Sequence, residues 1–99
     1  MTTEERRRAI LTHALRLAER HGFEAVYRDE LAAKAKVSPS LISKYWTAPQ
    51  LREAILLVAI EQKHLGVLAQ GLARRHPVAR AAPLSLRRAA ARKIVEEGP

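Results

Sequence analysis

Small polar side chains and one cation recur at helical spacing in VSPSLISKYW, residues 37–46. If this segment is a helix, Ser40, Ser43 and Lys44 stand at positions i, i+3 and i+4 and share one face. Hydroxyl groups and an ammonium group on a short helix suit the base edges and phosphates of a DNA major groove, which is wide enough to admit a helix. A solvated face without a ligand has the same composition, so the rest of the chain must decide between the two.

The histidines offer no catalytic or metal-binding pattern. They stand at positions 13, 21, 64 and 76, without the spacing of a metal site, and the chain has no cysteine to complete one. The sequence also contains no nucleophile–base arrangement and no glycine-rich phosphate loop. We therefore expect no enzyme activity, no cofactor and no bound metal.

The charge of the chain favours an anionic partner. Its 99 residues carry 18 lysines and arginines against 10 acidic residues, a formal net charge of +8. Residues 74–99 hold seven of these bases and two of the acids, so the end of the chain is strongly basic and the body only mildly so. Such an excess is typical of nucleic-acid-binding domains. The lack of cysteine fits a cytoplasmic location, and the longest apolar run, residues 54–60, is too short to span a membrane.

Apolar periodicity predicts a first helix over residues 3–21. Thr2 and Glu5 have the spacing of a capping box at its start. Gly22 follows its last turn and can take the left-handed conformation in which many helices end. The arginines at positions 6–8 are either an ordinary exposed helix start or an arm that contacts DNA.

Two short helices are expected next, and together they form a helix-turn-helix. The first covers about residues 29–36. The second begins after Ser38, a favourable N-cap that is followed by proline in the first helical position. In this second helix Ile42, Tyr45 and Trp46 are predicted to face the core, opposite the serines and the lysine.

A long fourth helix is predicted from about residue 48 to residue 75. Thr47 and Gln50 form a capping box at its start, and the His-Pro dipeptide after it ends it. Gly66 and Gly71 weaken its second half by roughly 1 kcal/mol each relative to alanine, so a bend or break is expected there.

The end of the chain is predicted to be a basic tail. Residues 76–83 are typical of a linker, and residues 84–96 can form a last short helix that contacts DNA, packs on the domain or stays disordered. No segment has the period of a β-strand. The expected organisation is an all-α helix-turn-helix domain with its fourth helix over residues 1–75, followed by the tail over 76–99.

The stretch ILTHALRLAERHGFEAVYRDELAAKAKVSPSLISKYW resembles the N-terminal DNA-binding domain of TetR-type repressors. The matching features are ILxxAL in the first helix, the GFEA turn, LA in the second helix, VS in the tight turn and the aromatic pair that closes the third. The resemblance covers about residues 8–60 and implies a homeodomain-like three-helix core plus a long fourth helix. VSPSLISKYW also resembles, more weakly, the turn and recognition helix of phage Cro and CI-type repressors, which makes a regulator of phage or plasmid origin a further expectation.

The resemblance implies where DNA would bind, because the third helix of the family enters the major groove. Carried over by position, Arg28 lies at a phosphate contact just before the second helix, Pro39, Ser40, Leu41 and Ser43 lie at base edges, and Lys44 and Tyr45 lie near the DNA backbone. The chain departs from the family pattern at Tyr27, Lys36, Ser43 and Pro49, where the usual residues are threonine, glycine, tyrosine and lysine. A left-handed lysine in the turn would cost about 1 kcal/mol.

Taken together, the residues and the resemblance predict a sequence-specific regulator of transcription that binds double-stranded DNA, namely a small repressor. The alternative is a protein-binding inhibitor or assembly adaptor on the same scaffold, because a fold does not fix a function. No small-molecule ligand is expected, since the ligand-binding domain of the family has no counterpart in the sequence.

A homodimer is expected because residues 54–60 are apolar on every side of the fourth helix, and a monomer would leave part of that surface exposed. Such a dimer would read a palindromic operator with half-sites about one helical turn (~34 Å) apart. The alternative is that residues 84–96 fold back and cover the same surface within one chain.

Overall fold

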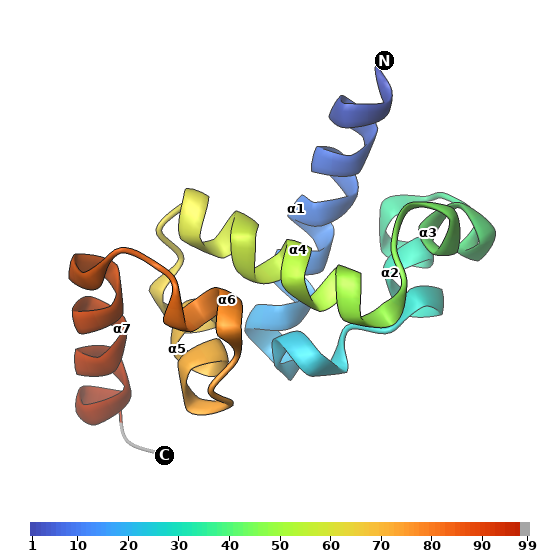
Figure 1. The fold of residues 1–99 in the computed structure, drawn as a ribbon. Coiled ribbons are helices and arrows are strands. Elements are labelled where there is room, and N and C mark those ends of the chain that lie inside the picture. The colour runs from blue at the N-terminus through green and yellow to red at the C-terminus, as the bar shows by residue number, and fades with distance from the viewer. Residues whose placement is uncertain (98–99) are drawn as a thin grey trace.

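Seven α-helices follow one another in the computed structural model, which describes residues 1–97 (Figure 1). They are α1 (Thr3–His21), α2 (Arg28–Ala35), α3 (Pro39–Tyr45), α4 (Ala48–Glu61), α5 (Leu65–Ala73), α6 (Pro77–Arg80) and α7 (Leu84–Glu97), with a 3-10 turn, η1 (Phe23–Ala25), after α1. These 97 residues contain no strand, which confirms the predicted all-α fold. None of these helices is long and apolar enough to cross a membrane. The last two residues of the predicted tail lie outside the described residues.

The start of α1 is confirmed, and its end differs in conformation from the prediction. The Thr2 hydroxyl accepts the Glu5 N–H at 3.1 Å, and the Glu5 carboxylate accepts the Thr2 N–H at 3.4 Å, which completes the capping box. Gly22 has φ 95° and ψ 146°, so it is extended at positive φ instead of left-handed helical. Glycine alone adopts that region readily, because it has no Cβ.

The turn between α2 and α3 contains the left-handed lysine. Lys36 has φ 58° and ψ 44°, the conformation for which the family usually has glycine. The Val37 N–H donates to the Ala32 carbonyl at 3.0 Å and closes the end of α2. The Ser38 hydroxyl then accepts the Leu41 N–H at 3.2 Å and caps α3. The predicted helix-turn-helix is therefore present, with hydrogen bonds that close α2 and cap α3 on the two sides of the left-handed lysine.

α4 starts with the predicted capping box but is shorter than predicted, because the expected break in the helix to residue 75 comes before the two glycines. It ends at Glu61, and the chain turns before either glycine. Lys63 takes φ 55°, and His64 accepts the Val67 N–H on its Nδ1 at 3.2 Å, so a histidine caps α5. The break allows α5 to fold back against α4.

α4, α5 and α6 lie close together at Gly71. A Cβ atom at this position would lie 2.8 Å from the Cβ of Ala79 in α6 and 2.8 Å from Cδ2 of Leu56 in α4. Real Cβ atoms essentially never make such short contacts. The glycine that was expected to weaken a helix instead lets three helices pack.

The segment predicted to be a linker contains α6. His76 accepts the Val78 N–H on its Nδ1 at 3.1 Å and caps this short helix. Ala79 and Ala82 are buried in the same core as the residues of α1 to α5. The chain between α5 and α7 is therefore part of the folded structure.

α7 forms within the predicted tail and packs against α5. Ala90 is buried in the core, Leu86 packs against it, and Arg87 donates its Nε–H to the Ala82 carbonyl at 2.8 Å. Figure 1 shows α7 at the end of the molecule away from α3. Of the three alternatives for this segment, packing on the domain is the one that the structure shows.

A side chain of α5 joins the C-terminal helices to the end of α1 and to η1. Gln70 donates its Nε2–H to the Ala18 carbonyl at 2.9 Å and accepts the Phe23 N–H on Oε1 at 2.9 Å. Arg74 also lies 2.8 Å from the Glu24 carboxylate. α5 thereby satisfies backbone groups at the point where α1 ends.

The apolar surface of α4 is mostly covered within the chain. Ile55, Leu56, Val58 and Ala59 are buried, whereas Ala54 and Ile60 are half-buried. Leu57 is 57 % exposed. α7 also exposes apolar side chains, Leu84 at its start and Ile94 and Val95 near its end. The surface that would support a dimer is therefore smaller than the sequence predicts.

Candidate nucleic-acid interface

α3 buries one side and exposes a polar one. Ile42 is 2 % exposed, and Tyr45 packs half-buried against the core. The exposed side carries Ser40, Ser43 and Lys44. This division into two faces is confirmed, with one correction: Trp46 follows the last turn of α3 in an extended conformation, so it packs on the core from outside the helix.

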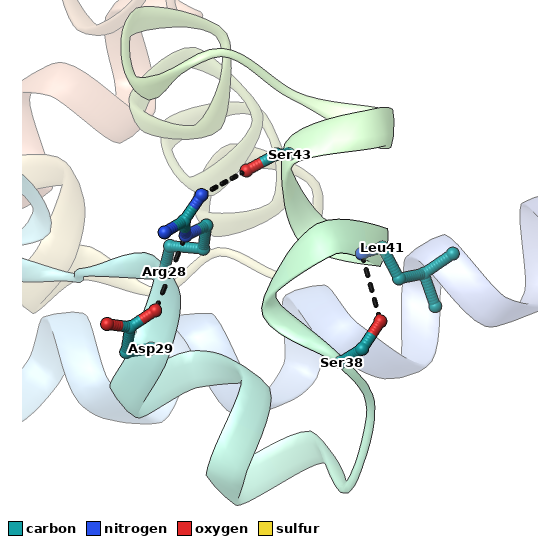
Figure 2. Close-up of polar contacts among 5 residues, drawn as sticks. All are labelled: Arg28, Asp29, Ser38, Leu41 and Ser43. Atoms are coloured by element: carbon teal, nitrogen blue, oxygen red, sulfur yellow. Dashed lines mark hydrogen bonds and ion pairs between the residues drawn. The ribbon is translucent and has the colours of Figure 1, made fainter.

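Arg28, the first residue of α2, is held against α3. Its Nη1 donates to the Ser43 hydroxyl at 3.0 Å, and its Nε donates to Oδ1 of Asp29 at 3.3 Å (Figure 2). The side chains of Arg28 and Asp29 are 55 % and 79 % exposed. The structure thus brings a predicted phosphate-contacting residue together with a predicted base-contacting residue on one exposed surface.

The predicted base-contacting residues in the first turn of α3 differ in how exposed they are. Pro39 and Ser40 are exposed, as groups that approach DNA must be. Leu41 is half-buried and packs against the core, and its N–H is taken by the Ser38 cap (Figure 2). The predicted contact of Leu41 with a base edge is therefore restricted to the part of its side chain that stays exposed.

Tyr45, predicted to lie near the DNA backbone, is covered on one ring face by an arginine of α1. The guanidinium carbon of Arg7 lies 4.9 Å from the centre of this ring, and Trp46 meets the same ring edge-to-face at 5.5 Å. A cation over an aromatic face contributes about 0.5–1 kcal/mol at an exposed site. Arg8 is paired with Glu61 at 2.9 Å. Two arginines of the predicted arm, Arg7 and Arg8, therefore connect α1 to the end of α3 and to α4.

A hollow of about 500 Å³ opens beside the bond between Arg28 and Ser43. Tyr27, Thr47 and Arg52 also line it, at the place where α2 begins, α3 ends and α4 begins. Arg52 was not predicted, because a single basic residue on a helix has no distinguishing spacing. Two arginines at one hollow make this surface attractive to an anionic backbone.

A capped recognition helix with an exposed polar face, a left-handed turn before it and an arginine held against it define a helix-turn-helix DNA-binding module. Residues 10–48 match the family model of the bacterial regulatory proteins of the tetR family. This segment is a TetR-type N-terminal helix-turn-helix DNA-binding domain, as the sequence predicts. The match includes every residue predicted to contact DNA, and it supports a DNA-binding regulator of transcription. Searches of curated proteins and of solved structures gave no match.

Proposed function

We propose that the chain is a sequence-specific repressor that binds double-stranded DNA in the cytoplasm with α3 in the major groove. The observation that carries this proposal is the exposed face of Ser40, Ser43 and Lys44, with Arg28 hydrogen-bonded to it. Short hydroxyl side chains allow the helix to approach base edges, and the two cations supply attraction to phosphates. A small protein that occupies an operator blocks access to it, which is the reason for proposing repression.

The segment VSPSLISKYW supports one finer statement. Its resemblance to the turn and recognition helix of phage repressors extends over the same ten residues that form the turn and α3. We therefore include a phage or plasmid origin in the proposal. Selection of the bound site, followed by a search for that site in phage and plasmid promoters, tests it.

The experiment that tests DNA binding is a salt titration with random duplex DNA. The protein should bind at low salt, and its affinity should fall with a log–log slope of about −0.9 for each phosphate that it neutralises. Circular dichroism in the same buffer controls for folding. A folded protein that fails to bind at low salt contradicts the proposal and favours the alternative of an inhibitor or adaptor that binds a protein.

A homodimer on a palindromic operator is the second part of the proposal. Two serines and one lysine read few bases, and a two-fold dimer doubles the sequence that is read. The exposed apolar side chains Leu84, Ile94 and Val95 of α7 support pairing through this helix. Pairing through α7 leaves α3 of both protomers free to bind DNA (Figure 1). Leu57 of α4 lies instead in a groove that Arg7 and Trp46 also line, so pairing there would place the partner next to the end of α3.

A further inference from the structure

We propose that Arg74, the residue that follows α5, is a positioning residue for DNA binding. It holds the carboxylate of Glu24 away from the hollow that Arg28 and Arg52 line, and this hollow thereby stays open to a phosphate of the DNA backbone. The inference rests on the proposed DNA-binding function. It gives a residue of the C-terminal helices, outside the matched segment 10–48, a part in how DNA binds.

Glu24 stands between two hollows of the surface. The hollow of about 500 Å³ beside Arg28 and Arg52 lies on one side. A hollow of about 560 Å³ lies on the other, where Gln70 and Arg74 are among the lining residues. Glu24 lines both, and its side chain is 45 % exposed. From one backbone position in η1, this carboxylate can therefore turn toward either hollow.

A carboxylate turned into the hollow with the two arginines would compete with a phosphate for the same guanidinium groups. Arg28 already donates to Asp29 and to Ser43. Arg52 forms no ion pair with any residue from 1 to 97, so it is the cation that a released Glu24 would engage. An ion pair formed there would take the place of the phosphate and cancel one of the charges that attract DNA.

Arg74 binds the carboxylate on the opposite side. Its Nε lies 2.8 Å from Oε1 of Glu24. The two backbones are held together, because Gln70, one turn earlier in α5, accepts the Phe23 N–H and donates to the Ala18 carbonyl, both at 2.9 Å. Exposed ion pairs contribute little to folding stability. The main consequence of this pair is therefore the direction in which the Glu24 side chain points.

A double-mutant cycle tests the inference, with affinity for random duplex DNA measured over a range of salt concentrations. Arg74→Ala should reduce the salt slope by about 0.9 and the affinity at 0.15 M salt by about 5-fold, the counterion-release contribution of one phosphate. Adding Glu24→Gln to Arg74→Ala should restore both values, because an amide has no charge to pair with Arg52. In the wild-type background, Glu24→Gln should change the affinity by less than about 2-fold, since Arg74 already holds the carboxylate.

Two further variants control for charge and for the ion pair. Arg75→Ala removes the same charge one residue away, from an exposed arginine that forms no ion pair within residues 1–97. Glu24→Gln should change the affinity of this variant no more than that of the wild type. Arg74→Lys keeps a cation near the carboxylate and should retain most of the wild-type affinity. Thermal melting should be nearly unchanged in all variants, because the Arg74 side chain is 71 % exposed and that of Glu24 45 %.

Three results overturn the inference, and they differ in what else they affect. If Arg74→Ala binds DNA as the wild type does, Arg74 has no part in binding and the proposed function stands. If Glu24→Gln changes the affinity by the same factor with and without Arg74, this arginine acts through its charge alone and the proposed function again stands. If the folded wild-type protein binds no duplex, the proposed function is wrong and the inference falls with it.

Discussion

Substituting Gly71 by alanine should destabilise the protein, although the same change usually stabilises a helix. In a helix interior, alanine is favoured over glycine by up to about 1 kcal/mol. Here the new methyl group would lie 2.8 Å from both Cβ of Ala79 and Cδ2 of Leu56. The Ala79 Cβ is fixed to the backbone of α6, so it can move aside only with a shift of that helix, and the Leu56 side chain is fully buried.

Overpacking of a core costs about 1–3 kcal/mol, and the fixed Cβ of Ala79 places this site toward the upper end. After the gain in helix propensity, a net loss of about 1–2 kcal/mol remains. For a domain of this size that lowers the melting temperature by about 4–16 °C. Thermal unfolding followed by circular dichroism measures it.

Gly66→Ala is the matched control within the same helix. Its Cβ would meet Cε1 of His64 at 3.5 Å and Cε of Lys93 at 3.6 Å, which are ordinary contacts. This variant should be unchanged or more stable by up to about 1 kcal/mol. If Gly71→Ala raised the melting temperature as Gly66→Ala does, the close approach of α4, α5 and α6 would be refuted.

Four further substitutions separate packing, DNA contact and association. Ile42→Ala should lower the free energy of unfolding by about 2–5 kcal/mol, measured in urea, because this side chain is 2 % exposed. Lys44→Ala should leave that free energy nearly unchanged and reduce the salt slope of DNA binding by about one; the opposite pair of results would reverse the two faces of α3. Val95→Arg should convert the dimer into a monomer near 11.1 kDa in light scattering, and Leu57→Arg should not. A wild-type protein that stays monomeric on a palindromic site would contradict the dimer.

The helix starts could be predicted because their causes are local. Each capping hydroxyl accepts an N–H three residues later, as Thr2, Ser38 and Thr47 do. Such spacing is visible in a sequence without knowledge of the fold. The faces of α3 were predictable for a similar reason, since residues three or four positions apart in a helix lie on the same face.

The place of the break after α4 could not be predicted in the same way. The turn contains neither glycine nor proline; it uses a left-handed lysine, Lys63, and a histidine cap, His64. Both are poor local signals, and the turn forms because α5 packs back against α4. A tertiary contact therefore overrides the continuous apolar pattern of this region.

The sequence could name residues of the candidate site, but not the contacts that these residues make with one another. Arg28 and Ser43 are 15 residues apart, and their bond depends on how α2 crosses α3. The stacking of Arg7 on Tyr45 joins α1 to α3 across an even longer stretch of chain. Contacts of this kind have no spacing rule, so only the folded structure reveals them.

The position of α7 relative to α3 sets the length of DNA that a dimer can span. The two helices lie toward opposite ends of a molecule whose longest dimension is 38 Å (Figure 1). If two protomers pair through α7, their recognition helices lie at the outer ends of the assembly, farther apart than one turn of B-DNA. Half-sites about two helical turns (~68 Å) apart then suit such a dimer better than the one-turn spacing expected from the sequence. Two operator halves separated by an intervening turn would leave the central base pairs uncontacted and open to another protein.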